Sequence, residues 1–120
     1  WKMGLDDQVM PHINMANIAC GFHGGDPDVI ATTLTLAKKN NVTVGAHPSY
    51  PDLQGFGRRS MALTKSELTN CIQYQIAALE GMAKIQGLEL SYVKPHGALY
   101  NDMMKKPEVL EAFEMVKRIQ

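Results

Sequence analysis

The sequence predicts an α/β fold built from parallel β/α units. Three short apolar or β-branched stretches, at residues 13–22, 42–46 and 90–94, have the length of strands. A helical pattern follows each of them, and this alternation is typical of parallel strands joined by right-handed crossovers. Three strands are too few to close a barrel. We therefore expect residues 1–120 to be a single partial domain of three βα units, with an N-terminal strand and a C-terminal part absent.

The first unit runs from strand 13–22 through a glycine turn into a helix that ends near Lys39. Asp26 is a suitable N-cap, because its carboxylate can accept hydrogen bonds from the free amides of the first turn. Pro27 suits the first helical position, where its missing N–H costs no hydrogen bond. Apolar residues then recur at steps of three and four, which gives the helix one buried face.

The second unit contains the strand 42–46 and a loop of about sixteen residues at 48–63. Ordered loops of that length are uncommon unless they have a function. Thr64 and Glu67 match a capping box, which predicts that a helix begins there. Its apolar residues keep helical spacing until Gly87, where a left-handed C-cap is expected.

The third unit contains the strand 90–94, the sequence Pro95-His96-Gly97 and a last helix that Pro107 can start. Apolar residues after Pro107 again recur at helical spacing. Because three strands leave sheet edges and helix faces uncovered, we also expect a homo-oligomer.

The composition is that of an ordinary globular protein. Lys and Arg total 12 and Asp and Glu total 12, so bulk charge gives no reason to expect a nucleic-acid partner. Hydrophobic residues make up 45% of the chain, and no apolar run approaches the roughly 20 residues that span a bilayer. We therefore expect a cytoplasmic protein without membrane contact. Cys20 and Cys71 lack CxxC spacing and are expected to be reduced thiols.

Histidines follow all three predicted strands, as His23, His47 and His96. The carboxyl ends of parallel strands meet at one rim of a sheet, with neighbouring strands about 4.8 Å apart. Three imidazoles there are within reach of a common substrate, proton or metal, and imidazole is suited to proton transfer near neutral pH. Each histidine alone could simply support its turn, but the recurrence favours a shared catalytic site. His12 precedes a strand and is expected at the opposite rim.

The same rim leaves open whether a divalent metal binds. His23 and His47 are the candidate ligands, because catalytic zinc commonly takes histidine and carboxylate ligands from scattered positions. No HExxH-type spacing is present to specify a metal. Asp26 joins the candidate catalytic group through its closeness in sequence to His23, although an N-cap role is the alternative.

Polar residues near the rim are candidates for binding the substrate. A lysine there can face a carboxylate or stabilise an oxyanion, and a pair of arginines can clamp an anion. Solvated surface side chains are the alternative interpretation. The candidates are Lys94, Arg58, Arg59, Tyr50 and Asp52.

Three segments resemble the LamB/YcsF family: NIACGFHGGDP at 17–27, GAHPSYPDLQGFGRR at 45–59 and VKPHGALYN at 93–101. With the first four residues and YQIAAL at 74–79, the likeness covers essentially the whole chain. The family has a (β/α) barrel-like fold related to glycoside hydrolase and metal-dependent deacetylase barrels. Its full-length members begin with an Asp-Leu-Asn-x-Asp strand, which this sequence lacks. Gly24 and Ser49 stand where many members have Ala and Gly.

The resemblance implies hydrolysis of the lactam of 5-oxo-L-proline to L-glutamate. It also implies ATP as co-substrate and a 5-oxoprolinase complex with subunits B and C. No Walker-type phosphate loop is present in the sequence, so we expect the nucleotide to bind largely to the partner subunits. The alternatives are a metal-dependent deacetylase-like hydrolase and a non-catalytic metabolite-binding or regulatory subunit.

Overall fold

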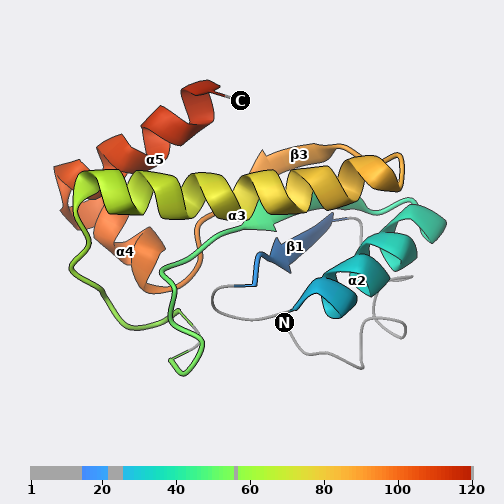
Figure 1. Cartoon of the computed structure of the whole chain (residues 1–120), viewed down its shortest axis with the longest axis horizontal. Helices are drawn as coiled ribbons and strands as arrows, with labels where there is room; N and C mark the ends of the chain where they lie inside the picture. The colour runs from blue at the N-terminus through green and yellow to red at the C-terminus, as the bar shows by residue number, and fades with distance from the viewer. Residues whose placement is uncertain (1–14, 22–25, 56, 120) are drawn as a thin grey trace.

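The core of the structure is a parallel sheet. It is formed by β1 (Met15–Ala19), β2 (Thr43–His47) and β3 (Leu90–Val93), in that order. Both strand pairings are parallel, so the predicted α/β fold of parallel β/α units is confirmed. The computed structural model of the chain describes residues 15–21, 26–55 and 57–119 (Figure 1).

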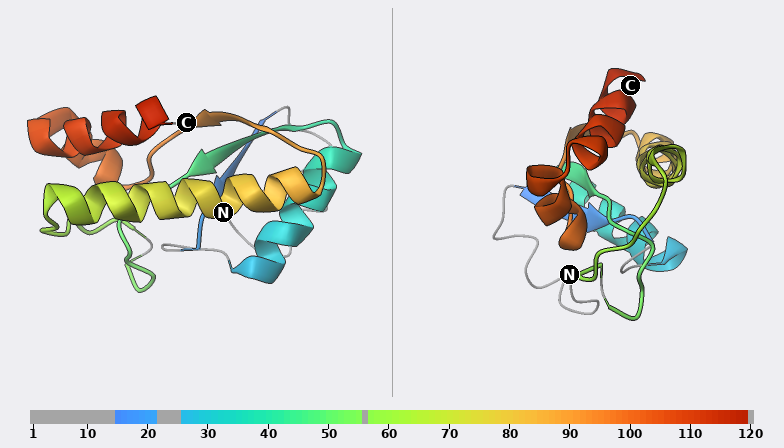
Figure 2. Two further views of the ribbon diagram at one scale, coloured as in Figure 1. Left: turned by 45° about the horizontal axis from the view of Figure 1, so that its top comes forward. Right: turned by 90° about the vertical axis from the view of Figure 1, so that its left-hand side faces the viewer.

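The helices of the described residues lie along the sheet and beyond one end of it. Both α2 and α3 contact the strands, α3 also packs along α5, and α5 packs against α4. In Figure 1, α3 runs along the sheet, and α4 and α5 lie beyond the carboxyl ends of the strands. Figure 2 shows the same arrangement from two further directions. The helices are α2 (Pro27–Lys39), α3 (Lys65–Ile85), α4 (Ala98–Lys105) and α5 (Pro107–Ile119).

One face of the sheet forms the core with the helices. Ala16 and Ile18 of β1 are buried there beside their register partners Val44 and Ala46 of β2. Alternate residues of a strand point to opposite faces, so the residues between them belong to the other face. The apolar stripes of α2 and α3 are buried in the same cluster, so β1, β2 and these two helices share one hydrophobic core.

The predicted helix starts are confirmed. The Asp26 carboxylate accepts a hydrogen bond from the Val29 amide at 2.9 Å. Thr64 and Glu67 form the reciprocal capping box, with bonds of 3.1 and 2.8 Å. Gly87 has a φ of +77° just after α3, the left-handed conformation expected of a C-cap region.

Helix α4 is absent from the sequence prediction, which begins the last helix at Pro107. It is only eight residues long, and no side chain caps it. Its N-cap Gly97 has a φ of +61°, and a Cβ there would lie 2.4 Å from the Gly57 carbonyl oxygen. The start of α4 thus depends on a long-range contact with the 48–63 loop, where Ala98 N–H donates to the same oxygen at 2.9 Å. A local sequence pattern does not encode that contact.

Both cysteines are free thiols, as predicted. Burial raises the pKa of Cys20 to about 12, so this thiol is not a nucleophile at neutral pH. Within the described residues, no helix is long and apolar enough to cross a membrane.

Candidate active site

The end of β2 and the turn after β3 bring two histidines together. His47 is the last residue of β2, and His96 lies three residues after β3. Two backbone hydrogen bonds hold the turn beside β2: Lys94 N–H donates to the Ala46 carbonyl at 2.8 Å, and His96 N–H donates to the Pro48 carbonyl at 2.9 Å. The sheet's own hydrogen bonding therefore continues past β3 and fixes where His96 sits.

The two imidazoles are in direct contact. His96 Nδ1 lies 2.9 Å from His47 Nε2, and the ring centroids are 4.7 Å apart with the planes at 80°. His47 Nδ1 lies 2.6 Å from the Lys94 carbonyl oxygen. The predicted convergence of His47 and His96 at one rim is confirmed. His12 and His23, which belong to the same prediction, lie outside the described residues.

The contacts of His47 assign the protons of both rings. A carbonyl oxygen only accepts, so His47 Nδ1 carries the proton and donates to Lys94. Burial is the main cause that lowers the pKa of His47 to about 4. The hydrogen bond to the Lys94 carbonyl acts in the opposite direction, and the nearby charges of His96 and Lys94 lower the pKa further. His47 is therefore neutral near pH 7, and its Nε2 accepts from His96 Nδ1–H. In neutral His96, the remaining lone pair is then on Nε2.

The low pKa of His47 makes stability depend on pH. The pKa of His47 in the folded protein, about 4, lies below the ordinary value of 6.5, so the unfolded chain binds this proton more readily. The contribution of neutral His47 to the free energy of unfolding is therefore full above pH 6.5 and is lost as the pH falls towards 4. We expect His47→Asn to lose less stability than the wild type between pH 7 and pH 5, measured by denaturant unfolding. Asparagine keeps a donor for the Lys94 carbonyl but does not titrate. An equal loss in both proteins would contradict this assignment.

The described residues do not by themselves fit a metal ion. No group of three or more His, Cys, Asp or Glu side chains within them is arranged to hold one. Two tetrahedral ligand nitrogens at about 2.05 Å from a zinc ion stand roughly 3.3 Å apart. In this structure His47 Nε2 and His96 Nδ1 lie 2.9 Å apart, at hydrogen-bonding distance from each other. Metal binding by His47 with His23 stays a prediction, because His23 is not described.

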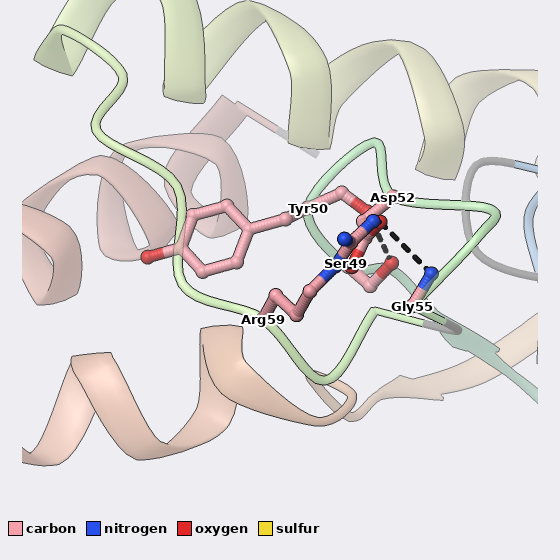
Figure 3. A network of polar contacts seen from close by, with 5 residues as sticks. All are labelled: Ser49, Tyr50, Asp52, Gly55 and Arg59. Atoms are coloured by element: carbon pink, nitrogen blue, oxygen red, sulfur yellow. Dashed lines mark hydrogen bonds and ion pairs between the residues drawn. The ribbon is translucent and has the colours of Figure 1, made fainter.

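Two of the predicted substrate-binding residues, Asp52 and Arg59, form an ion pair with each other. Arg59 Nε donates to Asp52 Oδ2 at 2.9 Å, and Arg59 Nη2 donates to Oδ1 (Figure 3). The Gly55 amide also donates to Oδ1, at 3.0 Å. The Arg59 hydrogen bond is the main reason why the pKa of Asp52 is lowered to about 2. The ion pair holds Arg59 beside Asp52. The Asp52 carboxylate thereby neutralises much of the positive charge of Arg59, which the sequence suggested for binding an anion.

An open hollow of about 540 Å³ lies beside this turn, lined on one side by Gly21 and on the other by Asp52, Arg59 and their neighbours. Gly21 comes two residues after Ala19, which pairs with His47. The hollow is therefore at the same rim of the sheet as the histidine pair.

Tyr50 joins the 48–63 loop to α4, and its role in substrate binding stays a prediction. Its side chain is buried, and its hydroxyl donates to Asp102 Oδ2 at 2.6 Å. Burial is the main cause that raises the Tyr50 pKa, so the phenol stays protonated. Ser60 Oγ donates to the other oxygen of Asp102 at 3.1 Å. These bonds join the 48–63 loop to α4, a connection that the sequence does not reveal because Asp102 lies far along the chain.

A second buried link, also missed by the sequence prediction, holds the segment after His47. The Ser49 amide donates to Gln75 Oε1 at 3.0 Å, and Gln75 Nε2 donates to the Ser49 carbonyl at 2.8 Å. Neither residue has measurable exposed surface. Gln75 occupies the apolar stripe of α3, and an uncharged amide at such a position is the signal that could have identified it.

The other predicted site residues are at the surface. Lys94 and Arg58 have exposed side chains, and Lys94 contributes its carbonyl to His47. Asp26 is exposed and caps α2, which supports the alternative interpretation given for it. Roles for these residues in substrate binding or catalysis stay predictions.

Comparison with known proteins gives one consistent set of similarities. The chain is 58% identical over 112 residues to the A subunit of 5-oxoprolinase from Vibrio parahaemolyticus, which covers 93% of this chain and 45% of that protein. It is 60% identical over 110 residues to the protein of the same name from Chromohalobacter salexigens, covering 92% and 44%. The chain thus spans about half the length of the curated relatives it matches.

A solved structure shares the fold. The crystal structure of lactam utilization protein from Thermus thermophilus superposes with a TM-score of 0.93 at 46% sequence identity, over 98% of this chain and 48% of that one. The model of the LamB/YcsF family matches residues 1–120. This chain is a member of the LamB/YcsF family.

Proposed function

We propose that this chain acts within an ATP-dependent 5-oxoprolinase as its A subunit. The reaction is hydrolysis of the lactam of 5-oxo-L-proline to L-glutamate. The observation that supports it most is the His47–His96 contact at the rim of the sheet, in a chain 60% identical to a protein named as the A component of 5-oxoprolinase. That name describes one component of a larger enzyme, and we propose subunits B and C as its partners.

His96 is the proposed catalytic base. A lactam is a stable amide, so its carbonyl must be activated before water can attack. Transfer of the ATP γ-phosphoryl group to the amide oxygen provides this activation, and His96 Nε2 then takes a proton from the attacking water. The ring C–N bond breaks, its nitrogen becomes the amine, and an acyl phosphate remains, which a second water hydrolyses. ATP, oxoproline and two waters thus give glutamate, ADP and phosphate.

His47 has a positioning role in this proposal. Its Nδ1–H is held by the Lys94 carbonyl and its Nε2 by His96 Nδ1–H. The protonated form that His96 acquires is stabilised by donating to a neutral neighbour. His47 thus fixes the tautomer and direction of the base.

The exposed cations Lys94 and Arg58 are the proposed partners of the substrate carboxylate. Asp52 neutralises much of the charge of Arg59, which makes that residue a weaker candidate. We assign the ATP site largely to the partner subunits. The described residues contain no Walker-type loop that would hold the nucleotide.

The test is an assay of the full-length chain with both partner subunits, 5-oxo-L-proline and ATP. We expect glutamate and phosphate in equal amounts, and neither when this chain or ATP is omitted. Acetate release from an N-acetylated sugar without ATP would favour the deacetylase alternative instead. Calorimetric binding of oxoproline without turnover in the complete mixture would favour a metabolite-binding role.

A further inference from the structure

The face of the sheet opposite the helices carries polar groups next to His47. Asn17 is the register partner of Gly45, and Ala19 is the partner of His47. Because side chains alternate along a strand, Asn17, Gly45 and His47 belong to one face. The buried residues that contact the helices lie on the other face.

Tyr92 of β3 crosses this face and fixes Asn17. Its hydroxyl donates to Asn17 Oδ1 at 2.6 Å. The ring passes directly over Gly45, where a Cβ atom would lie 2.2 Å from Tyr92 Cε2. Glycine at that position is therefore required for a tyrosine on β3 to reach an asparagine on β1, two strands away. In this orientation Asn17 Oδ1 faces the Tyr92 hydroxyl, and Nδ2 lies on the other side of the carboxamide.

The Asn17 carboxamide can form further hydrogen bonds besides the one that it accepts from Tyr92. An amide oxygen has two lone pairs and Tyr92 occupies one of them, whereas the Nδ2 group has two N–H donors. Asn17 therefore presents a donor and an acceptor side by side. The positions fit the histidine site: two residues along a strand and one strand across correspond to about 8 Å, from a rise of ~3.3 Å and a spacing of ~4.8 Å.

We propose that Asn17, held by Tyr92, recognises the lactam edge of the substrate. This inference rests on the proposed function. A five-membered ring locks its amide in the cis form, so that the N–H and C=O groups point in the same direction. Asn17 Nδ2–H then donates to the lactam oxygen while Oδ1 accepts the lactam N–H. Open-chain trans amides do not present this edge, and neither does the product glutamate, so the pair selects the cyclic substrate and favours product release.

The first test compares variants in the full-length protein with its partner subunits. Asn17→Asp keeps the size and the acceptor for Tyr92, but it replaces the donor with an oxygen that repels the lactam carbonyl. We expect KM for 5-oxo-L-proline to rise on the order of 100-fold. Tyr92→Phe, which only frees the carboxamide to rotate, should raise KM about 10-fold. The matched control is Asn70→Asp on the exposed surface of α3, which should leave KM unchanged.

The second test adds a substrate analogue and separates this inference from the proposed function. N-methyl-5-oxo-L-proline lacks the lactam N–H, and we expect it to inhibit the wild type with an affinity at least about 10-fold weaker than the KM of the parent substrate. If the wild type turns over oxoproline but Asn17→Asp and the N-methyl compound show unchanged affinities, the recognition role is wrong and the proposed function stands. If the wild type forms no glutamate, both are wrong.

Discussion

His96→Ala in the full-length protein with its partner subunits is expected to lower kcat about 10²–10⁴-fold, the usual cost of losing a positioned acid or base. The melting temperature should change little, because His96 is only partly buried and its main-chain hydrogen bond to Pro48 remains. KM for oxoproline should also change little, since the lost interaction is with the attacking water. Steady-state kinetics and thermal melts of the same preparations measure both quantities.

His47→Asn is the matched variant for that experiment. Asparagine keeps a donor for the Lys94 carbonyl but removes the acceptor that orients His96. We expect a smaller fall in kcat than for His96→Ala and a narrower pH range of activity. Wild-type turnover in both variants would remove the catalytic interpretation. Loss of stability with unchanged turnover per folded molecule would mean that the histidines only support their turns.

Gln75→Leu is expected to destabilise the protein by about 2–5 kcal/mol. The substitution places an apolar side chain of similar length in the core, but it leaves the buried amide and carbonyl of Ser49 without their partner. Each buried polar group that loses its hydrogen bond costs about 1–3 kcal/mol. Denaturant unfolding followed by circular dichroism measures the change in the free energy of unfolding.

Gln73→Leu provides the control for this substitution. Gln73 lies on the same helix, two residues earlier, with an exposed side chain. Its replacement should change the free energy of unfolding by no more than about 0.5 kcal/mol. Similar effects of the two substitutions would mean that the Gln75 contacts add nothing to stability.

The sequence predicts those parts of the fold that are encoded locally. Alternating apolar segments predict the strands and the parallel sheet, and the capping residues Asp26 and Thr64 mark helix starts that the structure confirms. The positions of His47 and His96 after successive strands predict their contact, because parallel strands place their carboxyl ends together.

Features that depend on long-range contacts are missed for a physical reason. The start of α4 needs a Gly57 carbonyl some forty positions away, and Tyr50 is held by Asp102 at a similar separation. Likewise, Arg59 looks suited to an anionic substrate, yet the fold pairs it with Asp52. Charge and residue type show what a side chain can bind, whereas only the fold shows what it does bind.

Long-range ¹⁵N–¹H correlation spectra of the imidazole rings in the full-length protein show which ring nitrogens carry protons, and therefore which histidine donates the hydrogen bond to the other. We expect that, at pH 7, His47 is protonated at Nδ1 and unprotonated at Nε2, and that it keeps this form down to pH 5 because its pKa is about 4. His96 should be protonated at Nδ1 in its neutral form. A proton on His47 Nε2 at pH 7, or an imidazolium at His47 by pH 6, would contradict the assignment of His96 as the base.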